Sequence, residues 1–442
     1  MGLLANTMPQ IVKRHWLLIP LFLLLTLAFY WPVTLFRLSP AQGDIPAQFL
    51  PWKIFWRQSI LNGEIPLWNP HVGCGMPFLA NFQSCVFSPV DWLLIAVPPK
   101  SFYGISLLVH SFLALTFTFL LARKTGVSRT GAFIAALAFS LGGFHQIHLM
   151  AGNFLTFSAA VWTPLVWWAG YGLVRSVQEA KTDRLRRMWL LTIALCLQVL
   201  AGHPQMLFYG LVFALLWILA TALLSTPSEV SAPTVRNPKS TSIILGFFLL
   251  AGALAALVCA VQLIPTLEYI FWSSRGEKLS FDEAAQFSFS FSRLLAMPVG
   301  DLFGSNRPGG NYWGYWKDWS SAYIGLWPWL LALIVIKSLI SKKSFPAFNQ
   351  RCPFPVIACI IVGIIALLLA LGRHNPLYAM VLKLPGFGHF RAPSKFLPYF
   401  ILPLSLLAAR GWDMLTEMVM DNGTENRRKW FIVLLTLGAC SA

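Results

Sequence analysis

Long apolar runs alternate with short polar segments along the whole chain. A helix that crosses the hydrocarbon core of a bilayer needs about 20 apolar residues. Runs of this kind lie at 16–36, 102–122, 131–150, 154–174, 188–202, 206–224, 241–265, 320–340, 354–372 and 397–411, with those at 188 and 397 the shortest. Another apolar run starts at 430 and stops with the sequence, as if within a helix. The pattern predicts an all-α polytopic membrane protein, a single transmembrane domain over 1–442 with about 10 to 11 helices.

Three polar segments are much longer than the others, at 37–101, 266–319 and 373–396. If the spans follow one another across the bilayer, all three segments lie on one side, which we call the outer side. The connections on the other side are mostly short and basic. Because polar residues gather on the outer side, we expect the function there. We find no internal repeat, unlike transporters that are built from duplicated halves.

The first outer segment carries its own helical pattern. Phe49, Trp52, Trp56 and Ile60 recur at helical spacing, and Lys53 falls on the other side of the same turn pattern. Such a helix is expected to lie in the plane of the membrane interface with its aromatic side down and its basic side in water. A fold with a long first outer segment that carries interfacial helices is therefore predicted.

Composition and charge agree with this topology. Hydrophobic residues make up 57% and charged residues 11%, and mean hydropathy is +0.65, which excludes an ordinary soluble domain. The net charge of +17 does not indicate nucleic acid, because the basic residues form short clusters between spans instead of one patch. Most of them fall on the side opposite the long segments. The positive-inside rule then places the N-terminus in the cytoplasm.

Asp44 is the carboxylate that follows the first span most closely, in Gly43-Asp44-Ile45-Pro46. One interpretation is a helix N-cap, because a carboxylate before a Pro-started turn satisfies free backbone donors. The other is a general base. A carboxylate at the membrane surface among aromatic residues can accept the proton of a hydroxyl that attacks an activated sugar or acyl donor.

Arg391 and Lys395 lie just before the span at 397 and on the outer side, against the general charge asymmetry. Both side chains can extend toward lipid headgroups. Alternatively, Arg391 binds a phosphate with two parallel hydrogen bonds from its guanidinium, and Lys395 adds a point charge. The sequence leaves both interpretations open.

Other polar residues are candidates at the outer ends of spans. His203 and Gln205 lie in an outer turn, where hydrogen bonds to a polar ligand are expected. Glu268 and Arg275 follow the span at 241–265 and are expected either to pair with each other or to contact a substrate.

Metal and disulfide chemistry receive little support from the residue spacing. His145 and His148 lie near His203 in the predicted topology, but no metal-ligand spacing is present, so no metal ligands are assigned. Cys74 and Cys85 both fall in the first outer segment, and whether they pair stays open.

Several motifs together resemble one family. They are Asp44; Pro66-Leu67-Trp68-Asn69-Pro70, followed by His71; Gly73-x-Gly75-x-Pro77; Gly202-His203-Pro204-Gln205; Gln262 to Glu268 with Arg275; Ala322 to Leu326; and Gly372-Arg373 through Phe390-Arg391-Ala392-Pro393. In this order they resemble the bacterial YfhO-type membrane proteins. That family is similar to the GT-C glycosyltransferases, which take a sugar from a polyprenyl-phosphate lipid and place it on a cell-envelope acceptor outside the membrane.

The resemblance implies a bacterial cytoplasmic membrane protein with an active outer face and inverting transfer. It implies that Asp44 is the first-loop carboxylate and Arg391 a ligand of the donor phosphate, with Lys395, Arg275, Glu268, His203, Gln205, Asn69 and His71 as further substrate-binding candidates. The expected partners are a polyprenyl-phosphate sugar, a saccharide or envelope-polymer acceptor and membrane lipids, without nucleic acid. Family members usually continue with more spans and a C-terminal outer domain. The first loop has no Asp-x-Asp motif, which argues against obligatory metal use, although a divalent cation stays open.

Two other function classes compete with glycosyl transfer. A transporter or flippase of a lipid-linked saccharide explains the basic and aromatic outer residues without a base. A non-catalytic envelope-assembly protein explains the fold alone. Transport predicts ionisable residues near the middle of the spans, whereas the candidates here gather at the outer ends.

Overall fold

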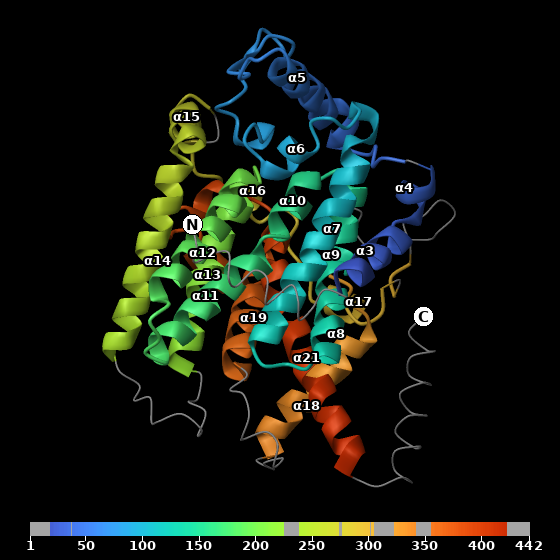
Figure 1. The fold of residues 1–442 in the computed structure, drawn as a ribbon, viewed down its shortest axis with the longest axis vertical. Helices are drawn as coiled ribbons and strands as arrows, with labels where there is room; N and C mark the ends of the chain where they lie inside the picture. The colour runs from blue at the N-terminus through green and yellow to red at the C-terminus, as the bar shows by residue number, and fades with distance from the viewer. Residues whose placement is uncertain are drawn as a thin grey trace.

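The structure is a computed structural model that describes residues 18–36, 38–224, 238–273, 276–300, 302–304, 322–341 and 355–421. Helices dominate it, as the sequence predicts (Figure 1). The part before the first long helix contains α3 (Leu18–Phe29), α4 (Trp31–Phe36), η1 (Ile45–Phe49), α5 (Leu50–Leu61), β1 (Trp68–Asn69), β2 (Met76–Pro77), η2 (Phe82–Ser84) and α6 (Pro89–Leu93).

The central helices follow as α7 (Pro99–Lys124), α8 (Arg129–Ser140), α9 (Gly143–Met150), α10 (Phe154–Ala160), α11 (Thr163–Gln178), α12 (Arg184–Leu200), α13 (Pro204–Leu224), α14 (Pro238–Val258) and α15 (Ala260–Phe271). The last part contains α16 (Phe281–Ala284), α17 (Arg293–Ala296), α18 (Leu326–Ser341), α19 (Val356–Ala370), η5 (Gly372–His374), α20 (Pro376–Val381), η6 (Phe387–His389), η7 (Pro393–Phe396) and α21 (Pro398–Asp421).

Small residues allow the bundle helices to approach closely. On α21, a Cβ at Gly411 would lie 1.9 Å from the carbonyl oxygen of Leu331 on α18. On α8, a Cβ at Gly131 would lie 2.6 Å from the carbonyl oxygen of Ala409 on α21. Helices in a membrane gain stability from such close backbone packing, since lipid is as apolar as the side chains. The bundle core around α21 therefore depends on glycine at these two positions.

Among the residues that the structure describes, four helices are long and apolar enough to cross a membrane: Pro99–Lys124, Arg129–Met150, Pro204–Leu224 and Lys239–Val258. Shorter apolar helices lie at Leu18–Phe29, Ala260–Phe271, Leu326–Ser341 and Val356–Ala370. The membrane character of the chain thus agrees with the sequence. The number of 10 to 11 spans stays a prediction.

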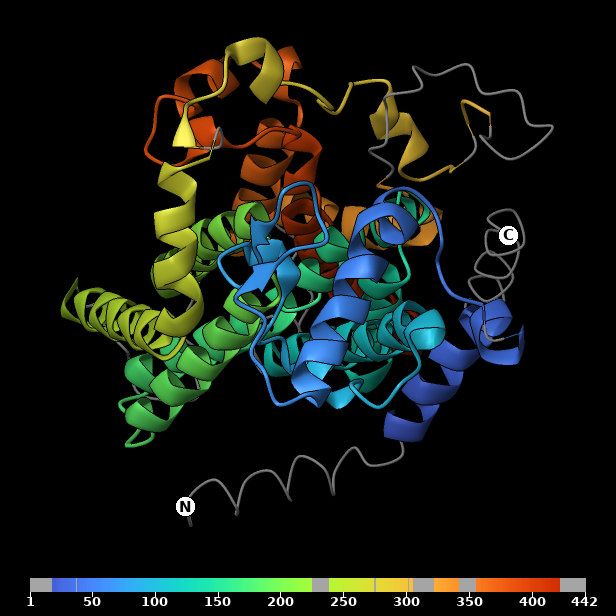
Figure 2. The same cartoon turned by 90° about the horizontal axis from the view of Figure 1, so that it is seen from above.

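The first outer segment folds over one end of the bundle. Helix α5 lies above α6 and the start of α7, and the view from above shows it crossing the central helices (Figures 1 and 2). The predicted helix is present, and Trp52 and Trp56 on its aromatic side are buried within the protein; its position in a membrane interface stays a prediction. Lys53, which we expected on a water-facing side, is only 6% exposed. That expectation is wrong, because a buried partner for Lys53 lies far along the segment.

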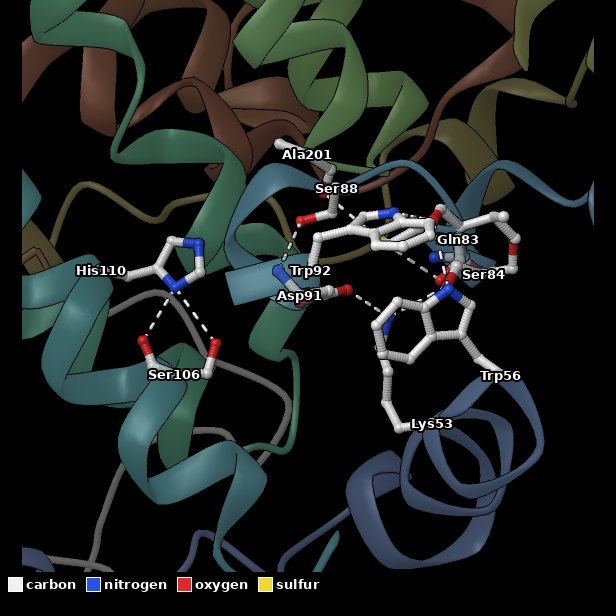
Figure 3. Close-up of polar contacts among 12 residues, drawn as sticks. Lys53, Trp56, Gln83, Ser84, Ser88, Asp91, Trp92, Ser106, His110 and Ala201 are labelled. Atoms are coloured by element: carbon white, nitrogen blue, oxygen red, sulfur yellow. Dashed lines mark hydrogen bonds and ion pairs between the residues drawn. The ribbon is translucent and has the colours of Figure 1, made fainter. Parts of the chain in front are cut away.

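The partner is Asp91 on α6, and the two side chains form a buried ion pair (Figure 3). The ammonium of Lys53 also donates a hydrogen bond to the carbonyl oxygen of Ser84, at 3.0 Å. The hydroxyl oxygen of Ser88 caps α6 by accepting the backbone N–H of Asp91, at 3.4 Å. Burial of a charge is costly unless it is paired and hydrogen-bonded, and both conditions are met here. The ion pair therefore stabilises the packing of α5 against α6.

Indole groups and a cysteine complete this junction. Trp56 and Trp92 both donate their Nε1–H to the carbonyl oxygen of Val86, at 3.2 and 2.9 Å. Cys85 is buried, and a Cβ at Gly202 would lie 2.0 Å from its sulfur, so the segment contacts the turn before α13. Burial raises the pKa of the Cys85 thiol to about 12. Cys85 and the exposed Cys74 are both free thiols, so they form no disulfide.

The junction predicts a large cost for breaking the ion pair. Lys53→Met leaves the Asp91 carboxylate buried without a counter-charge, and we expect the free energy of unfolding in detergent to fall by about 3–5 kcal/mol. The double variant Lys53→Met/Asp91→Leu removes both charges and should regain most of that loss. Thermal or denaturant unfolding of the purified proteins measures both. A single variant as stable as the unmodified protein would contradict the role of the pair.

Candidate functional site

The segment before α21 has an unusual backbone. Ala392 adopts φ +64°, the left-handed region that non-glycine residues rarely occupy. Pro393 follows it and begins η7, and the N–H of Ser394 donates to the carbonyl oxygen of Phe287, at 3.3 Å. Strain of this kind, of order 1–3 kcal/mol, persists where the surroundings fix the backbone, and it often accompanies functional sites.

Lys395 lies in η7 and points at the start of α13. Its Nζ is 3.3 Å from Nε2 of His203 and 3.2 Å from Oε1 of Gln205. The Nε2 of Gln205 in turn donates to the carbonyl oxygen of Arg391. Four of the sequence candidates therefore come together at one place, which we call the Lys395 cluster: His203, Gln205, Arg391 and Lys395.

His203 is buried in this cluster and uncharged near neutral pH. Burial lowers its pKa well below the ordinary value, and the nearby positive charge of Lys395 and the neighbouring His148 lower it further. The backbone N–H of Met206 points at Nδ1 of His203, at 3.3 Å, while Lys395 faces Nε2. A neutral imidazole has one lone pair and cannot accept from both donors. The contact between His203 and Lys395 is therefore a weak one.

The side chain of Arg391 is exposed, while its carbonyl is held by Gln205. A ligand from solvent or lipid can therefore reach the guanidinium. An anion at the Lys395 cluster itself would meet the Lys395 ammonium, supported by neutral hydrogen-bonding groups.

Asp44 occupies the N-cap position of η1, which leads directly into α5. Its side chain is exposed and makes no capping hydrogen bond, so the predicted capping contact is not formed. Gly43 before it has φ +57°, and a Cβ there would lie 2.2 Å from the carbonyl oxygen of Ala151. Gly152, with φ +76°, is likewise left-handed and lies against the backbone of residues 42–44. The turn at Gly43 and the turn at Gly152 therefore pack against each other. These contacts fix the backbone position from which the Asp44 side chain extends.

The turn at Gly152, which contacts the backbone beside Asp44, follows the helix α9 that carries His148. The N–H of Asn153 donates to the carbonyl oxygen of His148, at 2.8 Å, so the turn is closed on the end of α9. His148 is buried and lies within electrostatic range of His203. Asp44 and the Lys395 cluster therefore both lie near the C-terminal end of α9.

Asn69 and His71 have a local structural role in the hairpin of β1 and β2. The antiparallel register pairs Trp68 with Pro77 and Asn69 with Met76. Oδ1 of the buried Asn69 accepts the backbone N–H of His71, at 2.9 Å, which forms an Asx turn. The His71 side chain is exposed, and its ring packs edge-on against Phe55, with centroids 5.7 Å apart. Within the described part of the chain, neither residue makes a hydrogen bond or ion pair to the Lys395 cluster.

Glu268 is exposed on α15, and Arg275 lies outside the described residues, so their pairing stays a prediction. Among the residues that the structure describes, no three His, Cys, Asp or Glu side chains are grouped so as to hold a metal ion.

Sequence reasoning missed a small polar cavity beside the Lys53 and Asp91 pair. Its lining includes Tyr103, His110 and Trp162, and its volume of about 20 Å³ fits one water molecule. The Tyr103 hydroxyl and Trp162 Nε1–H are buried and have no hydrogen-bond partner in the described part of the chain, which suits such a water. His110 donates Nδ1–H to the carbonyl oxygen of Ser106, at 2.8 Å (Figure 3). These residues sit in apolar runs, where no spacing signal marks them.

Comparison with known proteins gives a fold and no family. No family model matches the sequence, and no curated protein matches it. Among solved structures, the mycobacterial arabinofuranosyltransferase AftD (mutant R1389S) has a TM-score of 0.53 and 15% identity, over 96% of this chain and 27% of that chain.

Two structures of archaeal oligosaccharyltransferase from Archaeoglobus fulgidus are also similar. AglB with an inhibitory peptide and a dolichol-phosphate has a TM-score of 0.49 and 12% identity, over 97% of this chain and 55% of that chain. The enzyme tethered to an acceptor peptide has a TM-score of 0.48 and 14% identity, over 97% of this chain and 54% of that chain. The chain thus spans about half or less of the length of these proteins.

The likeness to AftD shows a shared fold, that of the GT-C membrane glycosyltransferases predicted from the sequence. At this identity it shows the fold alone. The resemblance to YfhO-type proteins stays a prediction, because no family model matches.

The low pKa of His203 predicts a pH dependence of stability. The unfolded chain binds a proton at His203 near the ordinary pKa of 6.5, whereas the folded protein does not. The free energy of unfolding should therefore decrease as pH falls below about 6.5 toward the folded-state pKa. His203→Gln should reduce this decrease in thermal unfolding between pH 7 and 5, and His71→Gln, at an exposed histidine, should not. Equal pH profiles for His203→Gln and the unmodified protein would contradict the account.

Proposed function

We propose that the protein is a membrane glycosyltransferase that moves a sugar from a polyprenyl-phosphate donor to an acceptor hydroxyl of the cell envelope on the outer side. The observation that supports this most is that two groups suited to the reaction lie near the C-terminal end of α9. They are the exposed carboxylate of Asp44 and the cationic Lys395 cluster. The shared fold with AftD, an arabinofuranosyltransferase by name, fits sugar transfer.

In the proposed reaction, the Asp44 carboxylate accepts the proton of the acceptor hydroxyl. The hydroxyl oxygen attacks the anomeric carbon of the donor sugar, and the bond from that carbon to the phosphate oxygen breaks. The electron pair leaves with the polyprenyl phosphate. Attack from the face opposite the leaving group inverts the anomeric configuration. General-base assistance of this kind is typically worth 10²–10⁴-fold in rate.

The Lys395 cluster is assigned to the leaving phosphate, where negative charge increases as the bond breaks. Lys395 can turn from His203 to a phosphate oxygen at little cost, because the bond that it leaves is weak. His203 is then able to donate Nε2–H to the same ligand, since Nδ1 accepts from Met206. The exposed Arg391 adds a guanidinium that can donate two parallel hydrogen bonds to phosphate oxygens.

Asp44→Asn should abolish transfer and leave folding unchanged, because the side chain is exposed and makes no capping hydrogen bond. The measurement is release of polyprenyl phosphate from radiolabelled polyprenyl-phosphate sugars by purified protein in nanodiscs. Asp282→Asn, at another exposed aspartate, serves as the matched control. Full activity of Asp44→Asn would refute its role as the base, and no release by the unmodified protein from any donor would favour transport.

Lys395→Met should raise the KM for the donor and lower kcat, because the cluster is proposed to contact the phosphate in both the ground and transition states. Loss of a charge-assisted hydrogen bond corresponds to about tenfold or more in kcat/KM. Lys383→Met, at an exposed lysine of the same outer segment, should behave like the unmodified protein. If Lys395→Met changes only the KM for the acceptor, the phosphate assignment is wrong.

A further inference from the structure

The end of the bundle opposite α5 carries a dense group of basic residues. Helix α7 starts beside the first outer segment and runs for 26 residues, or about 39 Å at 1.5 Å per residue, so Lys124 lies at the far end. Residues 123–129 and 175–187 hold eight Lys and Arg residues against only Glu179 and Asp183. The local charge is therefore strongly positive, and the proposed transfer reaction does not use it.

Part of this charge is already neutralised by neighbours. Arg175 and Lys181 form ion pairs with Glu179, and Arg187 donates Nε–H to Asp183, at 2.8 Å. Both acidic residues of the group are thus engaged. The remaining cations have to find their counter-charge elsewhere.

Lys124 is the most unusual of these cations. Its Nζ is buried and has no hydrogen-bond partner among the described residues, and it lies 4.0 Å from the ring centroid of Trp168. The neighbouring charges of Arg187, Arg186 and Lys181 repel it, whereas the carboxylate of Asp183, which already pairs with Arg187, attracts it. An ammonium in this setting is costly unless an anion joins it.

Space for the Lys124 ammonium is provided by a glycine. A Cβ at Gly172 on α11 would lie 2.1 Å from Nζ of Lys124 and 3.6 Å from Cδ of Arg187. The Nε of Arg186 is also buried without a partner in the described structure. Donors from α7 and α12 thus converge beside Gly172.

Helix α12, which carries Arg186 and Arg187, also carries an apolar stripe. Leu185, Trp189 and Ile193 recur at every fourth position of α12, and they are 62%, 50% and 47% exposed. In a membrane protein such a stripe faces acyl chains. A ligand that fits both features carries a phosphate and long apolar chains.

We infer that Lys124, Arg186 and Arg187 form a binding site for the phosphate of an anionic phospholipid, whose acyl chains lie against the Leu185, Trp189 and Ile193 stripe. Basic pockets between membrane helices are suited to such headgroups. The site is separate from Asp44 and the Lys395 cluster, so it does not depend on the proposed transfer reaction.

Native mass spectrometry of the purified protein tests this site, with phosphatidylglycerol as the probe and phosphatidylcholine of the same chain length for comparison. We expect phosphatidylglycerol to bind more tightly than phosphatidylcholine. Lys124→Met should weaken phosphatidylglycerol binding about tenfold or more, because a charge-assisted hydrogen bond is lost. Arg129→Met, which removes an exposed charge near the same end of α7, should leave it within about twofold.

Gly172→Ala provides a second variant that keeps every charge. Its Cβ displaces the Lys124 ammonium, so phosphatidylglycerol binding should weaken here as well. This variant decides the outcome if Lys124→Met does not fold. Equal losses for Lys124→Met and Arg129→Met would show diffuse surface attraction and overturn the proposal. Binding of inorganic phosphate without any preference for phosphatidylglycerol would overturn the lipid as its source.

Discussion

The buried ion pair of Lys53 and Asp91 is the constraint on which the outer face of this protein depends. Removing two charges from water costs several kcal/mol per ion, and the cost is offset only when the partners meet in good geometry with further hydrogen bonds. Here the Ser84 carbonyl and the capped start of α6 supply those bonds. If α5 moved away from α6, the Lys53 ammonium and the Asp91 carboxylate would each lose their counter-charge. The segment is thereby held in one position over the bundle.

That position decides where the candidate site forms. Asp44 lies one short helix before α5, and its backbone is pressed against the turn after α9 by two glycines in left-handed conformations. Also near the end of α9, the start of α13 and the strained backbone at Ala392 bring Lys395 to His203 and Gln205. The proposed reaction needs both groups. Their common support is α9, so packing of the first outer segment and chemistry at the site are linked.

The sequence was sufficient for the features that rest on periodicity. Apolar runs predicted that helices dominate, and helical spacing predicted α5. The pattern also placed His203, Gln205, Arg391 and Lys395 on one side, and the structure brings them together. The sequence did not predict features that depend on a contact with a residue far along the chain or on a specific side-chain hydrogen bond. Lys53 was expected in water because its partner lies 38 residues away, and Asn69 holds a turn through a contact that no pattern reveals. The sequence left open whether Cys74 and Cys85 pair. In the structure both are free thiols, and Cys85 contacts the turn before α13.

The central claim is that one donor phosphate lies at the Lys395 cluster, within reach of a sugar that Asp44 also faces. A cryo-electron microscopy structure of the protein in nanodiscs with a bound polyprenyl-phosphate sugar tests it directly. The account predicts phosphate density within hydrogen-bonding distance of Lys395 Nζ, with the sugar between it and the Asp44 carboxylate. Phosphate density elsewhere, or a sugar turned away from Asp44, would contradict it.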